Sequence, residues 1–393
     1  MTDDHKDGQQ FLIARGGPFY DLQLQAKLVR RQDLKPTLRA ALFVALSWGV
    51  PLLLSLLAGT AFGPLAERPF LLDPGPWARF CVAIGLLVLA ETQIENNLRQ
   101  GVRNFFSGPL LPEASRAAAS AAVAKALRRR NAPAGDLVSL FLAIVSSFLL
   151  YHNMQDQPLA SWAATAGPEG PTPSLAAWWA VAVSNTLFWF LAARAFWRHI
   201  IWSMLLADLS KLETRLVATH PDGHAGLGFV GQYPNAYVLF TVAVSCVIAA
   251  SVTHEVLHGS FTVTAIAQVM GLWLALIFAY FGIPLAGFIS LLANFKKRAL
   301  RAASERGTDF QRQVERKTFG KNLVADDGKA MADDELGDPG KFYDAAKKLS
   351  PMLVTRSTLV PVSAAALLPF VAVAITQLPI KELVPVLKRL LLL

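Results

Sequence analysis

Apolar and polar residues alternate along this chain in long blocks, not at the short spacing of a soluble domain. Seven mostly apolar blocks are separated by stretches that are polar and often basic. A helix needs about 20 apolar residues to cross a bilayer, so the pattern predicts an all-α, polytopic transmembrane helical bundle. The predicted spans are Ala40–Phe62, Ala78–Glu95, Leu137–His152, Leu175–Phe196, Ala236–Thr253, Val263–Phe295 and Thr358–Leu378.

The amino-acid composition also predicts a membrane protein. Of the 393 residues, 53% are hydrophobic and 17% are charged, whereas soluble domains average about 25% charged. The net charge of +9 could indicate a nucleic-acid partner, but the basic residues flank the predicted spans. We therefore expect a lipid bilayer and no nucleic acid. The two cysteines, Cys81 and Cys246, fall inside predicted spans, which excludes a disulfide framework.

The distribution of Lys and Arg predicts the orientation, since basic residues concentrate on the cytoplasmic side. Segments 1–39, 97–135, 194–234 and 295–357 carry seven, seven, four and fourteen, against five on the other side. Seven spans with a cytoplasmic N-terminus satisfy this pattern, and the N-terminus lacks the apolar core of a cleavable signal peptide. We expect a bacterial inner-membrane protein. Its predicted parts are a cytoplasmic segment 1–39, a membrane domain 40–378 with cytoplasmic insertions 97–135, 197–234 and 296–357, and an amphipathic interfacial helix 379–393.

Several helices are expected to extend beyond the membrane. The Ala-rich stretch Ala114–Arg130 is strongly helix-forming. The fourth span is expected to continue to about Leu216, because no stop signal follows Phe196. The sixth, which Pro284 interrupts, is expected to continue to Arg306. A short helix is predicted near Phe342–Leu349 within an otherwise charged loop.

Acidic residues in the second span form the first candidate site. Glu91, Glu95, Arg99 and Arg103 recur every four residues and therefore share one helix face. Intramembrane carboxylates are costly and commonly face a cavity or a partner. One interpretation is an ion- or solute-binding site, linked to a proton or a cation and open to the cytoplasm, and the alternative is a structural Glu95–Arg99 pair with Glu91 bound to a polar neighbour. Arg194 and Arg198 are expected to reach the cytoplasmic surface. The candidate binding residues are Glu91, Glu95, Gln93 and Asn96.

A cytoplasmic loop after the fourth span forms the second candidate. Its polar and glycine residues could bind a metal, a phosphate or a helix end, and it lacks the G-K-[ST] of a P-loop. The alternative is a rigid turn, because glycine permits conformations closed to other residues. The residues concerned are His220, Asp222, His224, Gly226 and Gly228.

The third candidate is the H-E-x-x-H pattern of His254, Glu255 and His258 at the predicted outer face. Two imidazoles one turn apart can bind zinc, and a catalytic zinc needs a third protein ligand. His152 ends the third span on the same side and could supply it. A divalent metal, Zn²⁺, is the implied cofactor. The alternative is that these histidines hydrogen-bond to lipid headgroups.

Four short motifs stand out along the chain. They are Gly17-Pro18-Phe19-Tyr20 with Leu22-Gln23, Arg79-Phe80 leading to Ala90-Glu91, His220-Pro221-Asp222 with Gly226-Leu227-Gly228-Phe229, and Leu368-Pro369 with Pro379. Together they resemble a family of uncharacterised bacterial polytopic membrane proteins over most of the chain. That family more often has glycine at the position of Ala225. The resemblance implies a single bacterial membrane domain and no particular activity.

Three functions remain open from the sequence. Acidic and amide groups in the second span favour a transporter or channel for an ion or small solute. Helices that project beyond the membrane favour a signalling or scaffold subunit that docks a cytoplasmic protein or a second copy of the chain. The outer histidines favour a metal-binding membrane enzyme, although an enzyme is the less favoured class.

Overall fold

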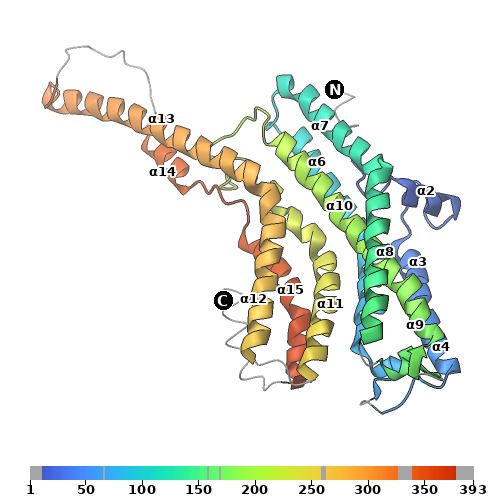
Figure 1. The fold of residues 1–393 in the computed structure, drawn as a ribbon. Helices are drawn as coiled ribbons and strands as arrows, with labels where there is room; N and C mark the ends of the chain where they lie inside the picture. The colour runs from blue at the N-terminus through green and yellow to red at the C-terminus, as the bar shows by residue number, and fades with distance from the viewer. Residues whose placement is uncertain are drawn as a thin grey trace.

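The secondary structure of the protein is almost entirely helical (Figure 1). The computed structural model describes residues 11–64, 67–156, 159–167, 170–257, 263–325 and 339–377. Within these ranges one two-stranded antiparallel hairpin, β1 (Ala164–Gly167) with β2 (Gly170–Pro173), pairs Ala164 with Pro173. The prediction of an all-α bundle is confirmed.

The apolar blocks form long helices, because a chain in lipid must satisfy its backbone polar groups internally. Six helices in the described part of the chain are long and apolar enough to cross a bilayer. The protein is therefore a multi-pass integral membrane protein. A shorter apolar stretch, Arg356–Ala372, contains most of the seventh predicted span. The six helices are Pro36–Leu57, Pro74–Ser107, Pro133–Gln155, Leu175–Leu209, Gly228–Val252 and Ala265–Phe319.

Most of these helices are composite, with α-helical turns joined either to π-helical turns or to 3₁₀ turns. The labels below follow Figure 1. The elements are α2 (Pro18–Gln25), α3 (Pro36–Val44), η1 (Ala45–Gly49), α4 (Val50–Leu57), η3 (Phe70–Leu72), α5 (Pro74–Pro76), η4 (Trp77–Ala83), α6 (Ile84–Ser107), α7 (Glu113–Asn131), α8 (Pro133–Asp156), η5 (Ser161–Ala163), α9 (Leu175–Trp179), η6 (Ala180–Asn185), α10 (Thr186–Leu209), η7 (Gly228–Tyr237), α11 (Val238–Leu257), α12 (Val263–Gly282), η8 (Ile283–Leu285), α13 (Ala286–Phe319), α14 (Gly340–Lys348) and α15 (Arg356–Gln377).

Three π-helical segments, η1, η4 and η6, contact one another inside the bundle. Two buried serines join them. Ser47 Oγ donates to the carbonyl of Phe80 at 2.8 Å, and Ser184 Oγ donates to the carbonyl of Ser47 at 2.6 Å. Wide π turns leave backbone carbonyls without their usual i+4 partner, and the serine hydroxyls supply donors to two buried carbonyls.

Helix packing brings distant segments together (Figure 1). α10 runs along α8 and also contacts α7, while α3 lies on α6 and α11 lies along α15. A single cluster of buried apolar side chains connects these helices. Of the six long helices, α8 has the smallest buried share in its apolar stretch, so most of its apolar surface faces lipid.

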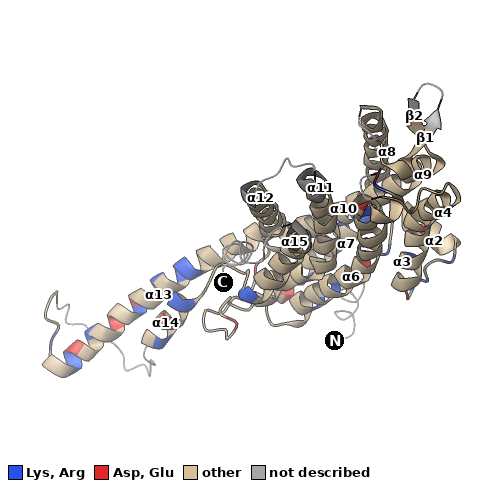
Figure 2. Ribbon diagram, turned by 90° about the horizontal axis from the view of Figure 1, so that it is seen from below, with Lys and Arg blue, Asp and Glu red and all other residues tan. Residues whose placement is uncertain are grey.

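A helical arm, formed by α13 and α14, projects from the bundle. The chain bends at η8, which contains Pro284, and α13 then leads away from the other helices (Figure 1). Lys, Arg, Asp and Glu are spread along the arm, whereas the bundle is mostly uncharged (Figure 2). The predicted end at Arg306 was too early, since α13 reaches Phe319.

Of the other helices predicted to extend beyond the membrane spans, two have nearly the expected bounds and one ends early. α7 and α14 coincide closely with the predicted helices. α10 ends at Leu209 instead of Leu216. The chain leaves the helix there, and the Arg215 N–H donates to the carbonyl of Leu110 at 2.7 Å, a bond that a continued helix could not make.

Candidate functional site

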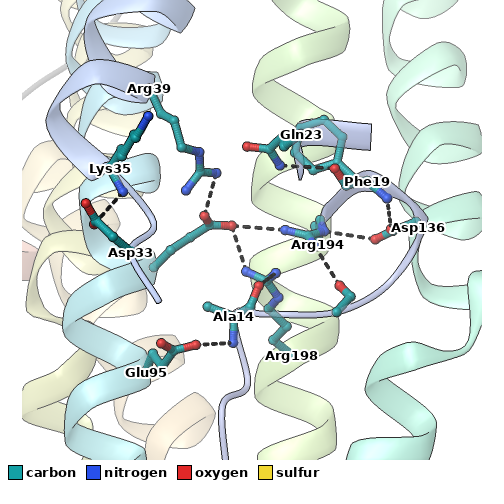
Figure 3. Close-up of polar contacts among 12 residues, drawn as sticks. Ala14, Phe19, Gln23, Asp33, Lys35, Arg39, Glu95, Asp136, Arg194 and Arg198 are labelled. Carbon is teal, nitrogen blue, oxygen red and sulfur yellow. Dashed lines mark hydrogen bonds and ion pairs between the residues drawn. The ribbon is translucent and has the colours of Figure 1, made fainter. Parts of the chain in front are cut away.

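Glu91 lies at the centre of a buried cluster of charged side chains. Arg39 Nη2 donates to its Oε2 at 2.7 Å, while Arg194 Nη1 and Arg198 Nη1 donate to Oε1 at 3.0 and 2.6 Å. Three segments of the chain, α3, α6 and α10, therefore meet at one carboxylate (Figure 3). Both side chains from α10 occupy the same face, because residues four apart in a helix are neighbours.

Two further carboxylates complete the cluster. Asp136 of α8 accepts from Arg194 Nε through Oδ1 at 2.9 Å and from the Phe19 N–H through Oδ2 at 2.8 Å. Glu95 is 1% exposed and accepts from Arg15 Nε at 2.8 Å and from the Ala14 N–H at 3.2 Å. Each acid therefore connects a membrane helix to the N-terminal part of the chain.

Residues Phe11–Gly17, here called the N-terminal strap, pass through this cluster without regular secondary structure. Arg198 Nη2 donates to the carbonyl of Ala14 at 2.6 Å, and Arg194 Nη2 donates to that of Gly16 at 3.2 Å (Figure 3). Arg130 Nη1 donates to the carbonyl of Leu12. Backbone polar groups that are buried outside a helix need partners from the rest of the protein, and the arginines donate to the carbonyls of the strap.

Apolar contacts hold the strap in place. The Phe11 and Ile13 side chains are each 1% exposed. Phe11 lies beside Trp202, with 5.8 Å between ring centroids. Phe19, just after the strap, lies under the Arg194 guanidinium at 5.1 Å, a cation–π distance. Within the segment predicted as a cytoplasmic N-terminal region, the strap is thus packed among the helices, whereas later residues such as Gln25 are exposed.

The cluster carries an excess of positive charge. Five arginines, Arg15, Arg39, Arg130, Arg194 and Arg198, are joined to only three carboxylates, Glu91, Glu95 and Asp136, or to the strap. Arg130, in α7, has its pKa lowered to about 10 by burial and by the neighbouring Arg198. It therefore stays cationic at neutral pH.

Arg39 is the least satisfied member of the cluster. Its side chain is 1% exposed and only Nη2 has a hydrogen-bond acceptor among the described residues. Nε and Nη1 are buried without one. Unpaired buried donors cost about 1–3 kcal/mol each, and more when charged, so this guanidinium favours an additional acceptor.

The candidate residues of the second span separate into different environments. Glu91 and Glu95 both belong to the cluster, whereas Gln93 Nε2 donates to the carbonyl of Asn235 at 3.2 Å and Asn96 is exposed. Three guanidinium groups around Glu91 would repel a cation there. The predicted Glu95–Arg99 pair is wrong, because Arg15 takes that place.

The location predicted from the sequence is wrong for two arginines of the cluster. Arg194 and Arg198 were expected at the cytoplasmic surface but are 3% and 7% exposed. They stay inside because Glu91 and Asp136 lie within reach. The sequence contains one indication of a buried arginine at this place. Arg39 lies at the edge of an apolar block, where a charged residue commonly marks a partner or a solute path.

The glycine-rich loop folds around Asp222. Its Oδ1 accepts from the N–H of His224 at 2.8 Å, and its Oδ2 accepts from that of Gly228 at 2.9 Å. The Gly226 N–H lies 3.1 Å from both oxygens. Partial burial would raise the pKa of Asp222, but these hydrogen bonds outweigh it and lower the pKa below its usual value.

This loop is also attached to the chain that follows the arm. His224 Nδ1 is 2.9 Å from the carbonyl oxygen of Ser350, and His220 is 2.7 Å from Asp222. Gly223 and Gly226 have φ of 70° and 96°, values that favour glycine. Because the backbone uses both Asp222 oxygens, the geometry agrees with a rigid turn rather than with a metal or phosphate site.

The predicted outer metal site lies largely outside the described residues. His152 is exposed at the end of α8. The backbone of His254 and Glu255 belongs to α11, but their side chains and all of His258 are outside the described part. Zinc binding at this group stays a prediction. In the described residues no three His, Cys, Asp or Glu side chains form a group that could hold a metal.

No protein-family model matches the chain, and neither a curated protein nor a solved structure is detectably similar to it. The resemblance to a bacterial membrane family therefore stays a prediction, and functional inference rests on the geometry of the charged cluster.

Proposed function

We propose that this integral membrane protein transports a small anionic solute by a path that includes the arginine-rich cluster. The supporting observation is the sign of the charge in the cluster, five arginines, of which Arg39, Arg194 and Arg198 are buried, against three carboxylates. Charged groups inside a membrane bundle commonly mark a solute path. An excess of guanidinium groups favours anions, because arginine binds oxyanions through directed N–H donors.

The strap occupies the arginine donors in the proposed closed state. The carbonyl oxygens of Leu12, Ala14 and Gly16 accept from arginine N–H groups that could otherwise bind the oxygens of an anion. In the proposed cycle the strap withdraws and the anion takes the place of these carbonyls. The two unpartnered donors of Arg39 provide a further binding position.

The membrane and the orientation belong to the same proposal. We place the protein in a bacterial inner membrane with its N-terminus in the cytoplasm. The support is the concentration of Lys and Arg in alternate connecting segments. With this orientation, the strap closes the cluster from the cytoplasmic side.

Flux measurements in proteoliposomes test the proposal. We expect uptake of radiolabelled chloride, phosphate or acetate, but not rubidium. Arg198→Gln should reduce the uptake, because it removes a donor from the path. Arg15→Gln should increase it, because it detaches the strap from Glu95. The control is Arg128→Gln, an exposed arginine of α7.

Two outcomes would overturn the proposal. One is rubidium uptake in place of anion uptake. The other is the absence of anion uptake in both the wild type and Arg15→Gln, since release of the strap should reveal any latent path. Circular dichroism and gel filtration of each variant identify those that are misfolded.

The helical arm favours a second candidate function, a scaffold for a cytoplasmic protein. α13 has 34 residues, a length of about 50 Å at 1.5 Å per residue, and projects away from the bundle (Figure 1). Replacing residues 311–338 with a short linker should release a co-purifying protein. That deletion keeps Lys296 bonded to the carbonyl of Leu349, so the membrane part should remain folded. Unchanged co-purification would contradict this function.

A further inference from the structure

A pocket of about 230 Å³ opens between α6, α10, η7 and α13, separate from the charged cluster. Five of the residues that line it carry carboxamide side chains. Asn97, Gln100 and Gln232 are exposed at the protein surface. Gln100 Nε2 donates to Asn104 Oδ1 at 2.8 Å, which leaves a carbonyl oxygen on one and an N–H group on the other. The five carboxamides are those of Asn97, Gln100, Asn104, Gln232 and Asn235.

Five further residues that line the pocket carry aromatic rings. Trp202 and Tyr233 are 3% and 6% exposed, and their ring centroids are 6.0 Å apart. Two polar atoms of the pocket residues, Trp202 Nε1 and Asn235 Oδ1, are buried without a hydrogen-bond partner in the described structure. The aromatic residues are Phe105, Trp202, Phe229, Tyr233 and Phe288.

The chemistry of this lining selects the kind of ligand. None of the residues that line the pocket is charged, so neither a phosphate nor a carboxylate would find a counter-ion. A carboxamide presents a donor and an acceptor side by side, which matches the edge of a nucleobase. Aromatic side chains stack on the face of a base. The volume is below the ~300–1,000 Å³ typical of drug-sized ligands, which suits a single heterocycle.

We propose that this pocket binds a free nucleobase or a similar uncharged planar heterocycle, stacked on an aromatic ring of the lining and hydrogen-bonded by the carboxamides. The inference is independent of anion transport, because it uses no residue of the charged cluster. The pocket and the strap nevertheless have one contact residue in common. Trp202 lines the pocket, and its ring also lies beside Phe11 of the strap.

Calorimetric titration of the full-length protein in nanodiscs tests the proposal, with adenine and uracil as probes. We expect one of them to bind. Asn97→Ala should weaken that binding about tenfold or more, the effect of losing a directed base contact. Asn97 is exposed, so the substitution should leave the fold unchanged. The control is Gln25→Ala, which removes an exposed carboxamide of α2 outside the pocket.

A second variant tests the position of the ligand. A Cβ at Gly101 would lie 3.7 Å from Trp202 Cη2, so a small side chain is accommodated there. Gly101→Leu should fill the pocket and abolish binding. The proposal is overturned if neither base binds at about 10 mM, if glucose binds and the bases do not, or if the two pocket variants bind as tightly as the control.

Discussion

Arg194 and Asp136 form an ion pair that joins α10 to α8, with 2.9 Å between Nε and Oδ1. The two residues are 58 positions apart in the sequence. Asp136 also accepts the Phe19 N–H, and Arg194 also contacts Glu91. One pair therefore fixes two membrane helices to the beginning of the chain and to α6. Such a network is sensitive to the loss of any member, because each removal leaves a buried charge uncompensated.

Glu91→Gln is the most direct test of this network. The substitution keeps the shape of the side chain but leaves Arg39, Arg194 and Arg198 without their shared carboxylate. Breaking a buried ion pair costs about 3–5 kcal/mol, so we expect a clear fall in the thermal unfolding midpoint in detergent micelles. Glu213→Gln is the matched control, since Glu213 is exposed. Equal midpoints for the two variants would contradict a central role for Glu91.

Gly135→Ala should separate α8 from α10. A Cβ at Gly135 would lie 2.9 Å from Trp197 Cε2 and closer still to two other atoms of that indole ring. Overpacking of this kind costs about 1–3 kcal/mol, and we expect a lower unfolding midpoint in the same assay. Gly101→Ala serves as control, because its Cβ would meet only an ordinary contact. The double variant Gly135→Ala, Trp197→Leu should recover part of the loss, and no recovery would count against the proposed clash.

The glycine-rich loop should depend on pH through Asp222. Because its folded pKa is lowered, the carboxylate stabilises the loop fully above its unfolded pKa of about 3.9. That stabilisation is lost as the pH falls through the lower, folded value. Asp222→Asn should therefore be less stable than wild type by about 1–3 kcal/mol at pH 7, and the difference should shrink toward zero in strong acid. A difference that stays constant with pH would contradict this account.

Single cysteines test the predicted orientation. In a background with Cys81 and Cys246 replaced by alanine, Thr165→Cys should react with a membrane-impermeant maleimide in intact cells. Ala325→Cys should react only after the membrane is permeabilised. Thr165 lies in the hairpin and Ala325 follows the helical arm, so both are outside the long apolar helices. The reverse result at either position would show the orientation to be wrong.

Sequence alone predicted the helices well and the partners of the charged residues poorly. Bilayer thickness sets the length of an apolar block, so the long helices follow from hydropathy. Gly226 and Gly228 likewise indicated the tight turn around Asp222. The partner of Glu91, in contrast, depends on which helices are neighbours in space, and nothing local to Arg39 or Arg198 contains that information. The strap has no periodicity to detect, because its hydrogen bonds go to side chains and not to a regular ladder.

The strap also constrains the order in which the protein can be assembled. Its residues leave the ribosome before the helices that bind it, since two of their donors, Arg194 and Arg198, are synthesised 178 and 184 positions later. Throughout that interval the helices from α3 to α10 must enter the membrane while Phe11 and Ile13 have no site to occupy. Closure of the strap is therefore a late event in biogenesis, and its completion reports that the four long helices from Pro36 to Leu209 have been inserted in the correct arrangement.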